Sequence, residues 1–367
     1  MLKAGIVGLP NVGKSTLFNA VVRARKAAAE NFPFCTIEPN LGVVTVQDPR
    51  LVELGRIAKV STLIPTTIEF VDIAGLVKGA SQGEGLGNQF LGHIRDVDAL
   101  VHVVRCFEDP DIHHVNGAID PKHDIELVQT ELLLADLQTL QKRQEKIARD
   151  LKRHDKHAEA EQVALQRFTA HLESGNPAST LDLHSDEMAL GKDLCLLTAK
   201  PTLFVANVKE GDLVSTESNR FVSAVTDFAR SHQACATVTL SAQLEIDLVD
   251  LAPSEAKEYL EVLAVKESGI DALIHATYRL LGLRTFFTFN DKESRAWTIR
   301  AGTTAPKAAG TIHTDFEHGF IKAETVALSE LIECGSISHA RDRGRYRMEG
   351  KDYVVRDGDV IHFKFHV

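Results

Sequence analysis

The sequence lacks the features of membrane-spanning proteins and of disulfide-stabilised secreted domains. No run of eighteen apolar residues occurs in its 367 residues, and no basic-then-apolar leader precedes the first strand-like segment. The five cysteines are odd in number, lie far apart and form no CxxC pair, which argues against a disulfide framework and against a zinc ribbon. We therefore expect a cytoplasmic protein with reduced thiols and no membrane partner.

Basic residues are also scarce, with 41 Lys+Arg against 51 Asp+Glu. The deficit lies in residues 1–283, because residues 284–367 hold 13 Lys+Arg and 12 Asp+Glu. The segment 142–157, KRQEKIARDLKRHDKH, is the exception, with seven Lys+Arg and three acidic residues. It is either a landing patch for a polyanion or a solvated helix face, and the charge pattern favours neither. We expect no DNA partner.

Short apolar runs separated by helix-like segments predict the fold class. Strands that alternate with helices are typical of an α/β protein with a mostly parallel sheet. In such sheets, ligands bind beyond the carboxyl ends of the strands. The expected strands are 3–8, 67–72, 99–105, 201–207 and 235–240.

Two segments depart from this alternation. Residues 122–200 carry apolar positions at helical spacing and predict three helices, which we interpret as an inserted antiparallel coiled-coil arm with the basic segment at its tip. The alternative is a set of helices packed flat on the sheet. Residues 284–367 alternate apolar and polar positions between turn signals, which predicts a small strand-rich domain. We therefore divide the chain into domains 1–283 and 284–367.

The stretch GLPNVGKS, residues 8–15, matches the phosphate-binding loop G-x-x-x-x-G-K-[ST] between an expected strand and an expected helix. Gly8 and Gly13 allow main-chain N–H groups to approach a triphosphate closely. Lys14 places a positive charge at the β- and γ-phosphates, and Ser15 offers its hydroxyl to Mg²⁺. The amino end of the following helix favours the anion.

Further motifs follow in the order found in phosphoryl-transfer switches. Asp72 ends a strand three residues before Gly75, as in the D-x-x-G motif that serves Mg²⁺ and senses the γ-phosphate, and Thr36 lies in a loop that could complete the Mg²⁺ shell. Leu76 stands where signalling GTPases of the Ras type carry a catalytic glutamine. Backbone groups, a K⁺ ion near Asn11, or His114 from another loop are then the candidates for orienting water.

The base-reading motif is also altered. Guanine is usually read by Asn-Lys-x-Asp, whereas this chain has Asn207, Val208, Lys209 and Glu210 at the end of a strand. Such a clamp should lose its preference for guanine, because Val208 and Glu210 replace its lysine and aspartate, and backbone groups near Asn207 and Val208 could serve adenine. We expect ATP to bind at least as well as GTP, under a cap formed by Ser241-Ala242.

Together these residues resemble the Obg-like ATPase family, in its YchF branch, over essentially the whole chain. The motifs that carry the resemblance include GLPNVGKST, NFPFCTIEPN, DIAGLVKGAS, RAWTI and GKDYVV. The resemblance implies a G domain, a helical arm, a C-terminal ubiquitin-like TGS domain, Mg²⁺-dependent ATP hydrolysis and association with ribosomes. Nucleotide contacts then fall on Asn11, Val12, Gly13, Lys14, Ser15, Thr16 and Val208, and Mg²⁺ contacts on Ser15 and Thr36. The segment between Asn19 and Phe32 departs from the family by being longer and more basic.

The first hypothesis is a slow ATPase switch that acts on the ribosome, as the large subunit or the 70S particle, and contacts rRNA. Lys14, Mg²⁺ and loop N–H groups would stabilise the charge that develops during attack of water on the γ-phosphate. Two alternatives remain open at this stage. One is a conventional GTPase in ribosome assembly, and the other is a ribosome- or RNA-binding adaptor that uses nucleotide only as a structural ligand.

Overall fold

The computed structural model describes residues 2–29, 40–73, 86–112, 117–231, 235–265 and 267–366. The expected site residues Thr36, Gly75, Leu76 and His114 lie outside these ranges. Within them, helices long and apolar enough to span a bilayer are absent. The described residues form two compact units, Met1–Val43 with Glu69–Leu280, and Val44–Ile68 with Leu281–Val367.

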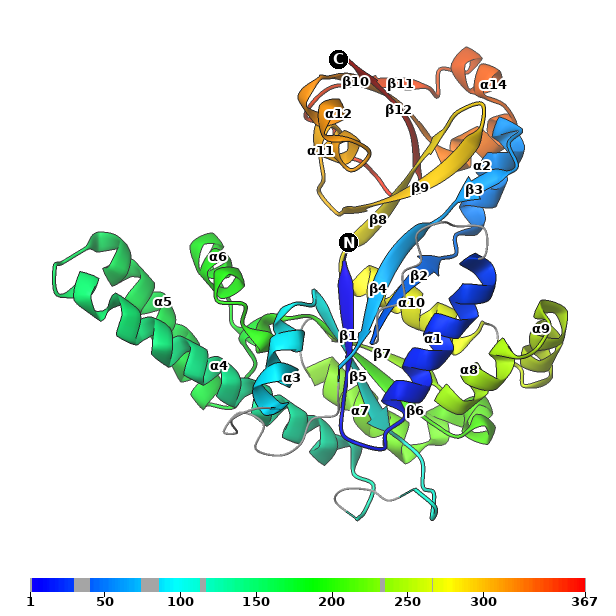
Figure 1. Ribbon diagram of the computed structural model, residues 1–367. Coiled ribbons are helices and arrows are strands. Elements are labelled where there is room, and N and C mark those ends of the chain that lie inside the picture. Colours follow the sequence, from blue (N-terminus) through cyan, green and yellow to red (C-terminus); the bar gives the residue numbers. More distant parts are fainter. Residues whose placement is uncertain are drawn as a thin grey trace. The chain divides into compact units, whose positions relative to one another are not determined.

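The sheet of the first unit has the strand order β2-β4-β1-β5-β6-β7 (Figure 1). Its strands are β1 Lys3–Val7, β2 Leu41–Val46, β4 Thr66–Asp72, β5 Ala99–Arg105, β6 Thr202–Asn207 and β7 Cys235–Leu240. The pairs from β4 to β7 are all parallel. All seven residues of β5 are buried, as expected for a strand covered on both faces. The predicted α/β class and its five strands are confirmed.

The helices of this unit lie between its strands and after β7, the last of them. They are α1 Lys14–Ala29, α3 Leu86–Arg95, α7 Arg220–Ser231, α8 Ala242–Val249, α9 Pro253–Val262 and α10 Gly269–Leu280. The helix α1 starts at Lys14, within the phosphate-loop motif, and α8 starts after β7 with the Ser241 hydroxyl as its N-cap. Because α1 packs against α8, the loop after β1 and the loop after β7 are brought together.

The inserted segment forms a pair of long helices, α4 Pro121–Leu151 and α5 Lys156–Glu173 (Figure 1). Ile125, near the start of α4, packs in the core beside the sheet, whereas Leu140 and Ile147 pack against Leu165 and Phe168 of α5. The later part of α4 is therefore paired with α5, which confirms the antiparallel arm over helices lying flat on the sheet. The third predicted helix is α6 Ser185–Asp193. Classification as a coiled coil stays a prediction.

A buried carboxylate fastens the return of the arm to α4. Asp136 is 1% exposed and accepts hydrogen bonds from the N–H groups of Leu197 and Thr198, both at 2.8 Å, and from the Thr198 hydroxyl at 2.7 Å. Burial raises the pKa of Asp136, and these hydrogen bonds oppose the rise. The segment that leads back into β6 is thereby held to the middle of α4.

The second unit contains a sheet of order β11-β10-β12-β8-β9-β3. Its strands are β3 Thr62–Ile64, β8 Leu283–Phe289, β9 Glu293–Arg300, β10 Phe320–Ala327, β11 Arg347–Glu349 and β12 Asp359–Phe365. Its helices are α2 Pro49–Ala58, α11 Ala305–Gly310, α12 Thr314–His318, α13 Leu328–Cys334 and α14 Ile337–Asp342. The C-terminal residues thus form a mixed α+β domain, and its assignment as a TGS domain stays a prediction.

The division of the chain differs from the expected boundary after residue 283 in one respect. Residues Val44–Ile68 belong to the second unit, because β3 pairs in parallel with β9 and because Leu51 and Leu54 pack with Phe287. In addition, Arg50 forms an ion pair with Asp357 at 2.7 Å. A three-residue strand carries no sequence signal for a partner more than two hundred residues away.

Candidate nucleotide-binding site

The phosphate loop adopts a backbone that requires its glycines. Gly8 and Gly13 have φ angles of 148° and 96°, and Asn11 between them has a φ of 60°. A Cβ on Gly8 would lie 2.5 Å from the carbonyl oxygen of Val103, and one on Gly13 would lie 2.4 Å from Nδ2 of Asn207. Both glycines are therefore needed for packing against neighbouring elements, in addition to leaving the main chain open to a ligand.

Lys14 is held over this loop. Its Nζ donates a hydrogen bond to the carbonyl oxygen of Leu9 at 2.6 Å, and the residue is only 7% exposed. Burial lowers the pKa of Lys14 to about 8, although the nearby Asp72 carboxylate acts in the opposite direction. The lysine is thus a partly desolvated cation whose charge depends on pH in the mildly alkaline range.

Ser15 and Asp72 are brought together by the sheet. Asp72 ends β4, which lies beside β1 with Asp72 in register with Ile6. The Ser15 hydroxyl donates to Oδ2 of Asp72 at 3.1 Å. Among the described residues, the other carboxylate oxygen, Oδ1, is buried and has no hydrogen-bond partner. Burial raises the pKa of Asp72, and Ser15 and Lys14 oppose the rise.

This pair fits a magnesium site. Mg²⁺ prefers hard oxygen ligands and keeps several of its waters. The Ser15 hydroxyl is such a ligand, and the orphaned Oδ1 of Asp72 is an acceptor that a metal-bound water would satisfy. The predicted third contributor, Thr36, lies outside the described residues.

A cavity of about 440 Å³ adjoins the phosphate loop. It is formed by the loop, by the segment after β5, by the residues after β6 and by the start of α8. Eight predicted site residues line it, and these are Asn11, Gly13, Thr16, Asn207, Val208, Glu210, Ser241 and Ala242. Six further lining residues were not predicted, and these are Phe107, Asp109, Ile112, Lys209, Gln243 and Leu244. Val12, another predicted residue of the phosphate loop, is not among the lining residues, and its side chain is buried.

Asn207 acts as a brace within this cavity wall. Its Nδ2 donates to the carbonyl oxygen of Val12 at 2.9 Å, and its Oδ1 accepts from the N–H of Ala242 at 2.9 Å. The side chain is 4% exposed. Asn207 therefore joins the phosphate loop to the start of α8, and both of its polar groups have protein partners.

The two altered base-reading positions, Val208 and Glu210, also have protein partners. Val208 is buried, and its N–H donates to the carbonyl oxygen of Leu240 at 2.9 Å. The Glu210 carboxylate accepts a hydrogen bond from the Tyr259 hydroxyl of α9 at 2.7 Å. The sequence offered no signal for Tyr259, because it lies 49 residues further along the chain.

The unpredicted residues after β5 form one wall of the cavity. From this part of the chain the sequence predicted only His114, which lies outside the described ranges. Asp109 forms an ion pair with Lys209, which also lines the cavity, and Nζ of Lys209 lies 3.5 Å from Oδ2 of Asp109. The available signal was the stretch EDPD, residues 108–111, which follows shortly after a buried strand, where ligand-binding loops of parallel sheets lie.

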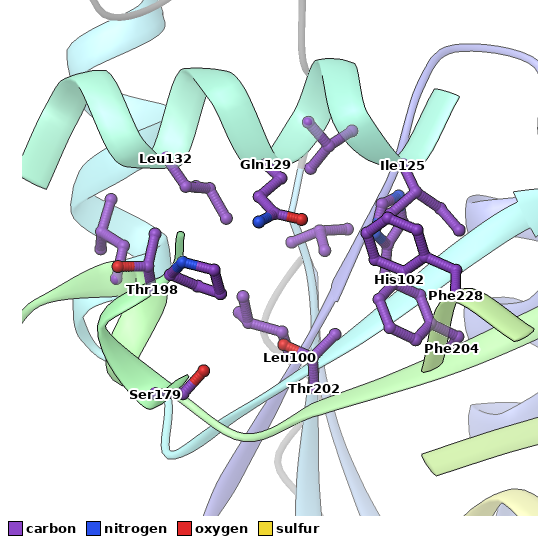
Figure 2. A pocket seen from close by; sticks show the side chains of 14 residues that line it. Leu100, His102, Ile125, Gln129, Leu132, Ser179, Thr198, Thr202, Phe204 and Phe228 are labelled. Atoms are coloured by element: carbon purple, nitrogen blue, oxygen red, sulfur yellow. The ribbon is translucent and has the colours of Figure 1, made fainter. Parts of the chain in front are cut away.

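A second cavity lies between α4 and the sheet (Figure 2). Its volume is about 50 Å³, which is enough for one or a few water molecules and far too small for a nucleotide. Gln129 of α4 points into it, and the ring of His102 packs beside Phe204, with ring centroids 5.4 Å apart (Figure 2). Burial, followed by the nearby Lys14 charge, lowers the pKa of His102 to about 3. We assign this cavity to the core.

Comparison with known proteins identifies close relatives. The family model described as a 50S ribosome-binding GTPase matches residues 3–148. The model YchF-GTPase_C, described as a protein of unknown function, matches residues 283–366. A Bacillus subtilis protein named ribosome-binding ATPase YchF is 49% identical over 366 residues, which cover 100% of both chains. The protein of the same name from Escherichia coli O157:H7 is 49% identical over 365 residues, or 100% of this chain and 99% of its own.

Solved structures agree with this relationship. The YchF GTPase of Schizosaccharomyces pombe superimposes with a TM-score of 0.88 at 35% identity, covering 99% of this chain and 97% of its own. A GTP-binding protein from Pyrococcus horikoshii has a TM-score of 0.62 at 21% identity, covering 100% of both chains, and it supports the fold alone.

Proposed function

We propose that this chain, which belongs to the YchF family, is a nucleotide switch that hydrolyses ATP with Mg²⁺ and associates with the ribosome. One observation carries the proposal. A phosphate loop with the hydrogen-bonded pair Ser15 and Asp72 adjoins a cavity of nucleotide size, and the guanine-reading positions in that cavity are replaced or engaged with protein groups. The 49% sequence identity over the full chain to proteins named ribosome-binding ATPase YchF supports the same proposal.

At the phosphate end, the main-chain N–H groups of residues 11–16 would bind the triphosphate, and Lys14 would leave the Leu9 carbonyl to contact the β- and γ-phosphates. Ser15 and Thr36 would hold Mg²⁺, with Asp72 orienting Ser15 and accepting from a metal-bound water. When bound, Mg²⁺ supplies charge neutralisation on the β- and γ-phosphates. K⁺ near Asn11 is a candidate additional ion.

Hydrolysis would proceed by in-line attack of water on the γ-phosphate. Leu76 has no polar group for orienting this water, so the Gly75 N–H, His114 or K⁺ would take over the task. Lys14 would stabilise the negative charge that develops on the transferred group. Without a catalytic glutamine we expect turnover to be slow until a partner binds.

At the base end, neither altered position offers a guanine clamp. Val208 is a buried aliphatic side chain, and the Glu210 carboxylate is already bonded to Tyr259. Guanine would leave its N1 and N2 hydrogens poorly matched, which costs about 1–3 kcal/mol for each unsatisfied buried group. We therefore propose that ATP binds at least as well as GTP. The conventional-GTPase alternative has support from the solved relative, which is named a GTPase.

The ribosome is the proposed partner, as the large subunit or the 70S particle. The basic segment 142–157 covers the end of α4, the turn and the start of α5. Such a concentration of positive charge at the end of a helical pair suits the phosphates of rRNA. The C-terminal domain, proposed to be a TGS domain, would supply a second contact. A protein with this role would act in the cytoplasm.

Calorimetric titration with ATP and GTP in magnesium buffer tests the base preference, and a large preference for GTP would refute it. Ribosome co-sedimentation in the same buffers, with hydrolysis followed in the same samples, tests the switch. Binding to ribosomes should change between ATP and ADP, and Lys14→Ala should abolish that change. Ribosome binding of Lys14→Ala that equals wild-type binding in all nucleotide states would favour the adaptor hypothesis instead.

A further inference from the structure

The side chain of Arg105, at the end of β5, is buried among backbone carbonyl groups. It is 1% exposed. Its Nε donates to the carbonyl oxygen of Phe107 at 3.1 Å, Nη1 donates to that of Ile112 at 3.0 Å, and Nη2 donates to that of Asp109 at 3.3 Å. The guanidinium carbon also lies 4.7 Å from the centroid of the Phe107 ring.

All three accepting residues line the nucleotide cavity. The segment 107–112 that contains them has no helix or strand. Among its described residues, the internal hydrogen bonds are one from the N–H of Ile112 to Asp109 O at 3.4 Å and one from the N–H of Asp111 to Asp109 Oδ1 at 3.0 Å. The shape of this wall therefore depends largely on the guanidinium, whose planar set of donors can bind several carbonyl oxygens in fixed directions.

The same strand register positions the other side of the cavity. Arg105 pairs with Asn207 across β5 and β6, and the N–H of Cys106 donates to the carbonyl oxygen of Asn207 at 2.8 Å. Asn207 in turn braces the phosphate loop against Ala242. One pair of neighbouring strand ends thus sets both the phosphate loop and the wall of the cavity.

From this geometry we infer that Arg105 is a positioning residue for nucleotide binding, which fixes the 107–112 wall against the base and sugar through three backbone carbonyls. The inference rests on the proposed nucleotide site and adds a determinant that acts at the base end. None of these hydrogen bonds joins Arg105 to the phosphate loop. Loss of Arg105 should therefore weaken the binding of ligands that carry a base, and should leave the binding of ligands made of phosphates alone unchanged.

The test compares two ligands on the full chain. The Kd values of ATP and of inorganic tripolyphosphate are measured by calorimetry in magnesium buffer for wild type and for Arg105→Met, which keeps length and removes the donors. We expect the Kd of ATP to rise by about tenfold or more, equivalent to about 1.4 kcal/mol, and that of tripolyphosphate to change by less than about twofold. In hydrolysis assays KM should rise more than kcat falls.

Two further variants keep the test decisive. Arg220→Met removes an exposed ion pair with Glu108 in the same segment, with 3.0 Å between Nη2 and Oε1, and should leave both Kd values unchanged. Arg105→Lys keeps a buried cation without the planar donor set and should give an intermediate ATP affinity. It also carries the test if Arg105→Met does not fold.

An unchanged ATP affinity in a folded Arg105 variant would overturn the inference. Equal weakening of ATP and tripolyphosphate would also overturn it, because that result indicates a general structural role. Failure of the wild-type chain to bind ATP would instead refute the proposed function, so the two failures are distinguishable.

Discussion

The hydroxyl of Ser15 donates a hydrogen bond to Oδ2 of Asp72 at 3.1 Å, although 57 residues separate the two in the chain. The bond links the first turn of α1 to the end of β4. It leaves Oδ1 of Asp72 buried, with no partner among the described residues. One oxygen of this carboxylate orients the Ser15 hydroxyl, and the other is left without a protein partner among the described residues. This arrangement suits a residue in the outer shell of a metal site.

Asp72→Asn should therefore weaken the response to magnesium. The amide can still accept from Ser15, but it loses the charge and the second acceptor. We expect the Mg²⁺ concentration for half-maximal ATP hydrolysis to rise by about tenfold to 100-fold, as is usual when an outer-shell group is lost. Asp250→Asn is the control, because Asp250 is an exposed carboxylate that pairs with Arg23 of α1. An unchanged magnesium requirement in Asp72→Asn would contradict this assignment.

ATP binding should be coupled to proton uptake by Lys14. The pKa of Lys14 in the free protein is lowered to about 8, and the negative charge of a triphosphate would raise it again. Below pH 8 the lysine is already protonated and affinity should be flat, whereas above pH 8 it must gain a proton on binding and affinity should fall. Calorimetry at pH 9 in two buffers of different ionisation enthalpy measures this uptake. Binding at pH 9 without proton uptake would show that Lys14 is not the coupled group.

Removing the Tyr259 hydroxyl should increase the relative affinity for GTP. The Glu210 carboxylate accepts a hydrogen bond from that hydroxyl at 2.7 Å. Tyr259→Phe removes this bond and leaves the carboxylate, which lines the cavity, available to a ligand. Because the pair is exposed, we expect a modest effect, with the ratio of ATP to GTP affinity falling by about threefold. The measurement is competitive displacement of a fluorescent nucleotide. Tyr346→Phe in the second unit is the matched control, and an unaltered ratio in Tyr259→Phe would mean that Tyr259 does not restrain Glu210.

Asp136→Asn should loosen the return of the arm. An amide in place of the carboxylate turns an N–H group toward donors at Leu197 and Thr198, which leaves buried donors unsatisfied. We expect a loss of about 3 kcal/mol of local stability. Hydrogen exchange at the Leu197 and Thr198 amides should accelerate accordingly. Asp150→Asn near the end of α4 changes an exposed carboxylate and should leave these amides protected, and similar rates in both variants would refute the role of Asp136.

Much of the fold and the phosphate end of the site could be predicted from the sequence, because these features depend on local spacing. The glycines, lysine and serine of residues 8–15 lie within eight consecutive residues, and the strands predicted for the parallel sheet are short, mainly apolar segments. The arm was predictable because helical periodicity persists along α4 and α5. Each of these signals is contained in a short stretch of chain, so no knowledge of distant partners is needed.

Only the tertiary structure determined the features that depend on contacts between residues far apart in the chain. The partner of Glu210 is Tyr259, the wall of the cavity is held by Arg105, and residues Val44–Ile68 join the C-terminal domain through β9. Asn207 was expected near the base, and the structure shows it bracing Val12 and Ala242. A sequence states which groups can donate and accept, but only strand order and register determine which of them meet.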